Sequence, residues 1–204
     1  MVAIYRLDRT AAEIAATFGL SAGDDPWAGG SISPGQFSPI ITAGREHVAG
    51  PRRPASPRRL VPRQWGVPPP RSAGDNARTG VLTVRNPDSP FWIGNLRNSE
   101  FRCLVPATAF MVWSKQVDRE GKRRACWVGA QDQLLFAMAG VWLDSEVPSF
   151  AVLTCAANAT LRQLGREVMP VMLPLQAHEQ WLRSDWGQAQ RLLESYGSGM
   201  TRIG

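Results

Sequence analysis

Three cysteines and two histidines are among the residues of this 204-residue chain that could act as nucleophiles, general bases or metal ligands. Cys103, Cys126 and Cys155 lie far apart, each in an apolar run, and no C-x-x-C pair occurs. His47 and His178 are equally isolated from one another. Zinc sites and disulfide frameworks need closely spaced or paired cysteines. We therefore expect buried, reduced thiols in a cytoplasmic protein, with no metal and no other cofactor.

Arginine is the second chemically distinctive residue type. Nine arginines and two acids, Glu46 and Asp75, fall between positions 45 and 85, and the formal net charge of the chain is +6. Residues 50–63 alternate proline and arginine, a pattern that excludes a helix because proline lacks an N–H and clashes with the preceding turn. This charge favours a polyanionic partner, a nucleic acid or an anionic membrane surface. A solvated loop without a partner is the alternative.

The hydropathy pattern predicts no membrane partner. No apolar run approaches the roughly 20 residues of a spanning helix. The first ten residues carry charges from position 6 and lack the apolar core of a signal peptide.

The elements that must position these residues are mostly strands. The helix at 10–19 opens with a Thr10–Glu13 capping box and ends at Gly19. The predicted fold is α+β: a mainly antiparallel curled sheet or β-barrel-like core with peripheral helices, forming one domain at 1–196 and a loose tail at 197–204. Short apolar or alternating runs predict strands near 39–42, 59–66, 81–84, 101–106, 109–115, 126–129, 134–142 and 150–155, and helices near 157–165, 175–183 and 187–196.

Several segments, in order along nearly the whole chain, resemble the SOS response-associated peptidase (SRAP) family. The most specific is Phe101-Arg-Cys-Leu-Val-Pro-Ala107 with Phe110 and Trp113. The others are Tyr5-Arg6 before a helix ending in Phe18-Gly19, Pro34-Gly35, Trp65-Gly66, Val84-Arg85-Asn86, Ser89-Pro-Phe-Trp92, Phe136-Ala-Met-Ala-Gly-Val-Trp142, Leu153-Thr-Cys155 with Asn158, and Met169-Pro-Val-Met-Leu173 with Trp181-Leu182.

The resemblance implies a role in the SOS response to DNA damage. Family members bind single-stranded DNA and capture abasic sites in it. An N-terminal cysteine, exposed when the initiator Met is removed, condenses through its thiol and α-amine with the sugar aldehyde. A nearby Asn, Glu and His assist, and a proposed autopeptidase activity rests on the same residues.

This chain departs from the family at all four of those positions. The cysteine position falls on Val2, the Asn on Thr83, the Glu on Val112, and the His on Gly165 or Arg166. An isopropyl group cannot act as a nucleophile, and valine cannot transfer a proton. The pattern indicates a pseudoenzyme, provided that Val2 lies beside Thr83, Val112 and the 164–167 turn. A free α-amine at Val2 could still form a reversible imine with an abasic aldehyde.

The leading hypothesis is therefore salt-dependent binding of single-stranded DNA without catalysis. The phosphate contacts are assigned to arginines and the base contacts to tryptophans. The alternative is a protein-interaction or regulatory module that docks through the 50–63 loop. The third possibility, an enzyme using other residues, lacks any Ser-His-Asp set or carboxylate pair in the sequence. The candidate DNA-binding residues are Arg6, Arg58, Arg59, Arg71 and Arg85, with Trp65 and Trp92 as stacking platforms.

Overall fold

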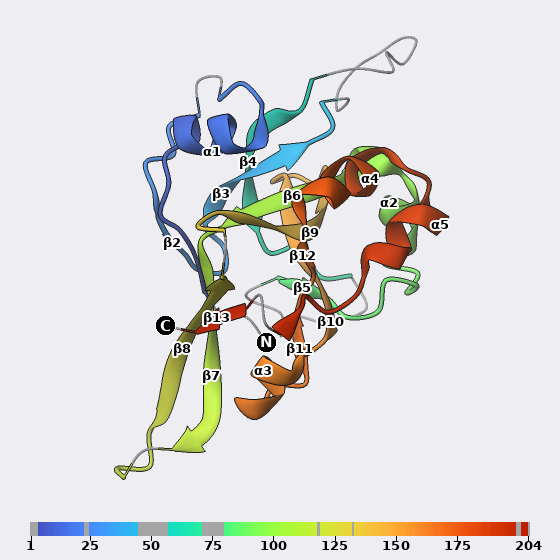
Figure 1. Ribbon diagram of the computed structural model, residues 1–204. Coiled ribbons are helices and arrows are strands. Elements are labelled where there is room, and N and C mark those ends of the chain that lie inside the picture. Colours follow the sequence, from blue (N-terminus) through green and yellow to red (C-terminus); the bar gives the residue numbers. More distant parts are fainter. Residues whose placement is uncertain are drawn as a thin grey trace.

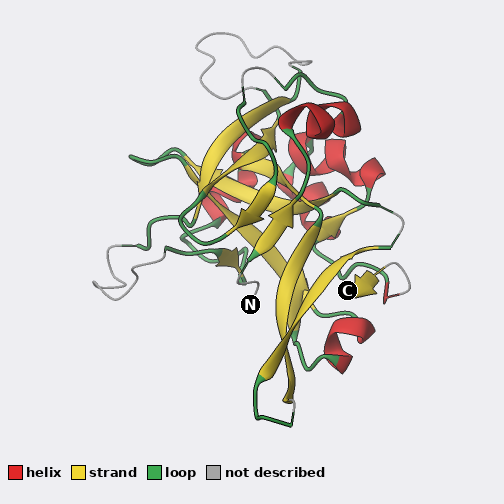
Figure 2. Cartoon of the chain, turned by 90° about the vertical axis from the view of Figure 1, so that its left-hand side faces the viewer, coloured by secondary structure: helices red, strands yellow, loops and turns green. Residues whose placement is uncertain are grey.

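The computed structural model describes residues 4–22, 25–44, 57–70, 80–117, 119–131, 133–198 and 201–203. Figure 1 shows a curled sheet at the centre of the molecule, with α1 above it and α2, α4 and α5 beside it. A long hairpin made of β7 and β8 extends away from this body, next to α3 (Figures 1 and 2). Within the described ranges, no helix is both long and apolar enough to cross a membrane.

The described residues form these elements. The strands are β1 (Tyr5–Leu7), β2 (Gly30–Ile32), β3 (Phe37–Thr42), β4 (Arg59–Trp65), β5 (Thr83–Val84), β6 (Arg102–Ala107), β7 (Ala109–Val117), β8 (Arg123–Ala130), β9 (Phe136–Leu143), β10 (Ser149–Ala156), β11 (Val168–Pro170), β12 (Met172–Leu173) and β13 (Thr201–Ile203). The α-helices are α1 (Ala11–Phe18), α2 (Ile93–Arg97), α3 (Ala159–Gln163), α4 (His178–Arg183) and α5 (Trp186–Ala189). Short 3-10 turns occur at Ser99–Phe101, Leu175–Ala177 and Gln190–Leu192.

Five strands close into a barrel. In the order β10–β4–β3–β6–β9, each strand pairs with the next, and β9 pairs with β10 to complete the ring. Phe150 of β10 lies opposite Trp65 of β4 on one side and Trp142 of β9 on the other. Within the ring only the β4–β10 pair is parallel, and β5, which lies outside the ring, also pairs with β10 in parallel. The predicted α+β fold with a mainly antiparallel, barrel-like core is confirmed.

A second sheet has the order β13–β8–β7–β1–β2. Tyr5 pairs with Phe110, which pairs with Val128, and all three side chains are buried in the common core. The other face of this sheet carries the neighbours of these residues, because side chains alternate along a strand. That face is the one available to solvent or a ligand.

The first helix follows the sequence closely. The Thr10 hydroxyl accepts from the Glu13 amide, the Glu13 carboxylate accepts from the Thr10 amide, and Gly19 ends the helix with a φ of 64°. Ile14 and Phe18 face the core. The predicted capping box and end are confirmed.

A buried arginine anchors the helices beside the barrel. Arg102 of β6 donates from Nε to the carbonyl of Trp181 at 2.6 Å and from Nη1 to that of Leu96 at 2.9 Å, and Nη2 donates to Ser184. Burial lowers the pKa of Arg102 to about 10, so the guanidinium stays charged at neutral pH. This one side chain ties α2 and α4 to the barrel wall.

Some predicted boundaries were wrong. The helix expected at 187–196 is α5 followed by the turn at Gln190–Leu192, and the strand expected at 81–84 begins at Thr83. The tail expected to be loose instead contains β13, where Thr201 pairs with Ala130 of β8. β7 and β8 form a hairpin, since they pair up to Val117 and Arg123.

Candidate nucleic-acid interface

The turn between α3 and β11 is attached to the edge of β7. The Lys115 amide donates to the Leu164 carbonyl at 3.1 Å. Arg166 donates from Nη1 to the Trp113 carbonyl at 3.2 Å. Gly165 lies between them with a φ of 72°, a conformation that favours glycine. The turn therefore supplies partners for main-chain groups along the β7 edge.

A small polar pocket of about 230 Å³ lies where this turn meets β5 and β7. Its charged lining residues are Arg85, Lys115, Arg166 and Glu167, three cations against one carboxylate. Lys115 Nζ lies 4.0 Å from Glu167 Oε1, but both side chains are well exposed, so water screens this pair. A concave surface with excess positive charge concentrates anions. Gly165 and Val168 complete the lining.

Strand pairing sets the position of Arg85. The preceding residue, Val84 of β5, pairs with Leu153 of β10, and its carbonyl accepts from the Thr154 hydroxyl at 2.9 Å. Arg85 leaves the strand end as an exposed side chain. The sequence predicted Arg85 as a phosphate contact, and the structure brings it together with the 164–167 turn. Lys115 was not predicted, because its position on the solvent side of β7 emerges only from the strand register.

The positions equated with the catalytic residues are distributed around this pocket. Thr83 in β5 and Val112 in β7 are both buried, and neither lines the pocket. Gly165 does line it. Val2 lies outside the described residues. The first described residue, Ile4, accepts a hydrogen bond from the Met111 amide at 2.9 Å, next to Val112.

Gly165 has little space for a side chain. A Cβ atom there would lie 2.5 Å from Cδ of Lys115. A histidine at position 165 would therefore require Lys115 to move and would also adopt a strained left-handed backbone. Thr83, Val112 and Gly165 offer no group that titrates near neutral pH.

The expectation that Trp65 and Trp92 stack on bases was wrong. Trp65 is fully buried, donates to the Leu82 carbonyl at 3.1 Å and packs edge-on against Tyr5. Trp92 is 5% exposed and packs against Phe91. Both indole rings serve the core, so neither presents a face to a ligand.

Trp113 is the exposed tryptophan instead. Its side chain is 42% exposed, whereas Phe110 and Trp142 are buried. Trp113 lines an open hollow with Lys122 and Arg123 of the β7–β8 hairpin. Phe110 and Val112 face the core and Trp113 faces away from it, but all four residues of Phe110-Met-Val-Trp113 are apolar, so the sequence carries no signal for this difference.

Arg6 shares the outer face of the sheet with two tryptophans. It pairs with Ala109, and Met111 pairs with Trp127, so strand alternation places Arg6, Trp127 and Trp113 on one side. The Arg6 guanidinium lies 3.8 Å from the centre of the Trp127 ring. This cation–π contact orients a positive charge on the solvent face.

The other arginines predicted to contact phosphates differ in their surroundings. Arg58 is engaged by Glu179, with Nη2 2.6 Å from Oε1, and it also donates to the Phe18 carbonyl. This commitment argues against the predicted phosphate contact. Arg59 is an exposed residue at the start of β4. Arg71 and residues 50–56 of the 50–63 segment lie outside the described residues.

The three cysteines are not suited to act as nucleophiles or as ligands of a metal site. All three are free thiols, and Cys103 and Cys126 are buried. Burial raises the pKa of Cys103, and raises that of Cys155 to about 11. Both groups are therefore thiols at neutral pH and weak nucleophiles. Among the described residues, no three His, Cys, Asp or Glu side chains gather closely enough to hold a metal ion.

Comparison with known proteins finds similarity over nearly the whole chain. Residues 1–203 match the family model described as SOS response associated peptidase (SRAP). A solved structure from Bacteroides thetaiotaomicron is 17% identical with a TM-score of 0.76, and the alignment covers 98% of this chain and 90% of that one. One from Bordetella bronchiseptica is 19% identical with a TM-score of 0.74, covering 99% and 98%. At such identities these structures establish a shared fold alone. No curated protein matches the sequence.

Proposed function

Because the chain belongs to the SOS response associated peptidase (SRAP) family, we propose that it is a cytoplasmic single-stranded DNA-binding protein that has lost the family's abasic-site chemistry. One observation carries the binding proposal: Arg85, Lys115 and Arg166 converge on one pocket that holds a single carboxylate. Phosphate oxygens are the ligands that such a cluster selects from a nucleic acid.

The exposed side chains indicate the path of the bound single-stranded DNA. A phosphate occupies the Arg85 pocket, and the chain continues across the outer face of the β7–β8 sheet. There the exposed Trp113 ring offers a stacking surface, and Arg6, Lys122 and Arg123 offer further cations. Stacking on one aromatic ring contributes about 1–3 kcal/mol per base and tolerates any sequence. Trp113 replaces Trp65 and Trp92 in this role.

The loss of chemistry rests on the residue types. Val2, Thr83, Val112 and Gly165 occupy the positions of the family's Cys, Asn, Glu and His. Ring closure on an aldehyde needs an amine and a thiol on one residue, so Cys103, Cys126 and Cys155 cannot substitute. The protein would then hold a damaged strand without forming a stable adduct.

Fluorescence anisotropy with plain and abasic single-stranded oligonucleotides tests the binding proposal. We expect similar affinity for the two oligonucleotides and a steep loss of affinity with salt. Arg85→Glu should weaken binding at least about tenfold, since it adds one repulsive charge and removes one contact. Arg97→Glu, at an exposed arginine outside the pocket, is the charge-matched control. Equal affinity of the two variants would refute the Arg85 interface.

The absence of any DNA binding would favour the second hypothesis, an interaction module on the same scaffold that docks a protein through the 50–63 loop. Pull-down with a variant that lacks only residues 50–56 distinguishes the two, because this deletion leaves the barrel strand β4 intact. Retained DNA binding in that variant, with loss only in Arg85→Glu, assigns the affinity to the pocket.

Covalent trapping tests the proposed loss of chemistry. The unaltered protein should give no heat-stable adduct with an abasic oligonucleotide on a denaturing gel. Val2→Cys restores a thiol beside the α-amine once Met1 is removed, and Val2→Ser is its control. A stable adduct with the unaltered protein would overturn the proposal. Borohydride trapping on the same samples detects the reversible imine of the Val2 amine.

A further inference from the structure

A second cavity lies at the opposite end of the molecule from the Arg85 pocket. It has a volume of about 450 Å³ and is formed by the end of α1, the segment 133–135 before β9, and the start of α4. Figure 1 places α1 at the far end of the molecule from α3, which precedes the Gly165 turn. The two pockets share no lining residue. Small-molecule sites in proteins span about 300–1,000 Å³.

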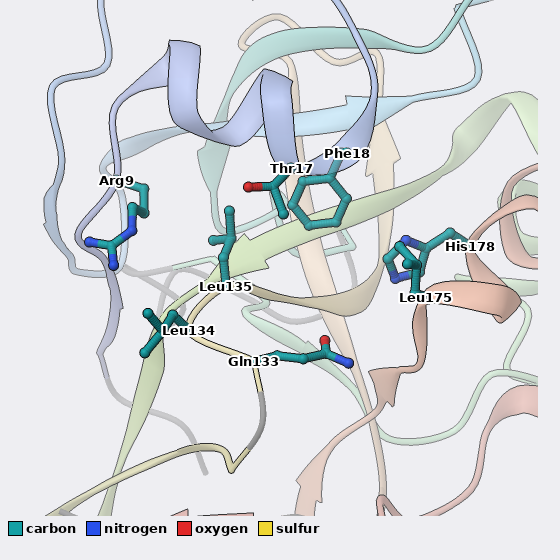
Figure 3. Close-up of a pocket in the computed structure, with 8 residues that line it drawn as sticks. All are labelled: Arg9, Thr17, Phe18, Gln133, Leu134, Leu135, Leu175 and His178. Atoms are coloured by element: carbon teal, nitrogen blue, oxygen red, sulfur yellow. The ribbon is translucent and has the colours of Figure 1, made fainter.

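The cavity is walled by apolar side chains. Phe18, Leu135 and the ring of His178 are buried around it, with Phe18 stacked on His178 at 5.5 Å. In Figure 3, Leu134 lies on one side and Leu175 on the other, with Leu135 between them. The pocket therefore has a buried apolar floor and an apolar rim.

The two rim leucines are unusual in their exposure. Leu134 is 62% exposed and Leu175 is 61% exposed, the two highest values for large apolar side chains in the described part of the chain. Isolated exposed leucines are ordinary on protein surfaces. Two such residues at the mouth of one cavity indicate apolar surface that a ligand covers.

The charge of the lining points to the polarity of that ligand. Arg9 is the only charged side chain in the lining, which contains no carboxylate. Figure 3 shows Arg9 beside Leu134, across the pocket from His178. Glu13 lies 4.0 Å from Arg9 but outside the lining, and its other oxygen caps Thr10. Thr17 and Gln133 supply the remaining polar groups.

His178 adds no positive charge at neutral pH. Its Nε2 lies 3.3 Å from the Leu173 carbonyl, an arrangement in which Nε2 donates. Burial lowers the pKa of His178, and the nearby Arg58 lowers it further. The ring therefore presents a neutral aromatic wall, and Arg9 remains the single charge facing a bound molecule.

We propose that this cavity binds a small amphipathic carboxylate, with its apolar chain between Leu134, Leu135 and Leu175 and its carboxylate at Arg9. The site is independent of the Arg85 pocket and of the proposed DNA binding. An apolar body excludes water from the leucines, and the cation at one end fixes the orientation.

Isothermal titration and methyl NMR with sodium octanoate test the proposal. We expect saturable binding with a Kd of about 1 mM or below, and shifts in the methyl signals of Leu134 and Leu175. Hexanoate should bind about tenfold more weakly, because two methylenes fewer are buried. Octylamine should bind more weakly than octanoate, since it places a second cation near Arg9.

Surface variants locate the site without disturbing the core. Leu175→Asn should weaken octanoate binding about tenfold and Arg9→Gln about 2–5-fold. Val147→Asn and Arg97→Gln are the matched controls, each at an exposed residue outside the cavity, and should bind as the unaltered protein does. Affinity for single-stranded DNA should be equal in all four variants.

Three results would overturn the proposal. One is no saturable octanoate binding at concentrations about tenfold above the expected Kd. Another is equal affinity for octanoate and octylamine. The third is a change of oligomeric state in Leu175→Asn without a change in octanoate binding, which would assign the leucines to contact with a second copy of the chain.

Discussion

The guanidinium of Arg166 donates to the main-chain carbonyl of Trp113 at 3.2 Å. This contact fixes one cation of the Arg85 pocket to the strand that carries the exposed indole ring. The proposed phosphate site and the proposed stacking site are therefore held in a defined relationship by the main chain of β7. The proposed interface depends on this attachment as much as on the charges themselves.

Lys115→Gln should reduce the salt dependence of DNA binding. If Lys115 contacts one phosphate, its removal lowers the slope of log K against log salt concentration by about 0.7 for a single strand. Anisotropy titrations at several salt concentrations give the slope. Arg191→Gln, at an exposed arginine outside the pocket, should leave it unchanged. An unaltered slope in Lys115→Gln would remove this residue from the interface.

Gly165→Ala should destabilise the protein by at least about 1–2 kcal/mol, because the residue has a φ of 72° and its added Cβ would also lie 2.5 Å from Cδ of Lys115. In thermal unfolding this corresponds to a fall in Tm of about 2–8 °C for a chain of this size. Gly94→Ala is the control, since Gly94 is helical and its added Cβ would meet nothing within 4 Å. That control should stabilise the protein slightly. Equal effects of the two changes would contradict the left-handed turn.

Arg102→Met should destabilise the fold by at least about 3 kcal/mol. It leaves the carbonyls of Leu96, Trp181 and Ser184 without the donors they have now. Urea unfolding measures the loss, and Arg97→Met, at an exposed site, should stay within about 0.5 kcal/mol of the unaltered protein. Near-native stability of Arg102→Met would show that the guanidinium does not anchor α2 and α4.

Acidification should cost stability through His178. Burial holds its pKa below the ordinary value, so the unfolded chain binds the proton more readily than the folded protein. Stability is therefore fully present above about pH 6.5 and falls as the pH drops below it, by at most about 1.4 kcal/mol per unit. Urea unfolding at pH 7.5, 6.5 and 5.5 should show a smaller fall in His178→Gln. An equal fall in both proteins would exclude His178 as the source.

Cys155 should react slowly with thiol reagents although it is half-buried. A pKa raised from 9.0 to about 11 leaves about a hundredfold less thiolate at pH 8 than an unshifted thiol. Labelling followed by mass spectrometry should show modification over hours in the folded protein and over minutes in urea. Rapid labelling in the folded state would contradict the raised pKa and would show that this thiol is a competent nucleophile.

The sequence was sufficient to predict the elements that depend on local chemistry. The Thr10–Glu13 capping box and the apolar or alternating runs near 101–106 and 109–115 act within a few residues, and the helix start and the two strands that they predict are confirmed. Features of this kind depend on residues that are close together in the chain, so one sequence is enough to predict them.

The roles of the tryptophans could not be assigned in the same way. Trp65 and Trp113 are both aromatic residues in strands, and burial separates them only after the register of β4 and β7 is known. Lys115 joins the pocket because Leu164, 49 positions away, accepts a hydrogen bond from its amide. Neither the closing of the barrel nor the cavity at Leu134 and Leu175 has a local signature.

The closure of the barrel by β10 has a consequence for biosynthesis. This strand spans Ser149–Ala156 and pairs with β4, β5, β9 and β11, so it joins more neighbours than any other strand described. A nascent chain that has not yet delivered β10 from the ribosome leaves β4 and β9 with open, apolar edges. Such edges invite pairing with other chains. The growing polypeptide is therefore most in need of a chaperone after β9 has emerged from the ribosome and before β10 has emerged.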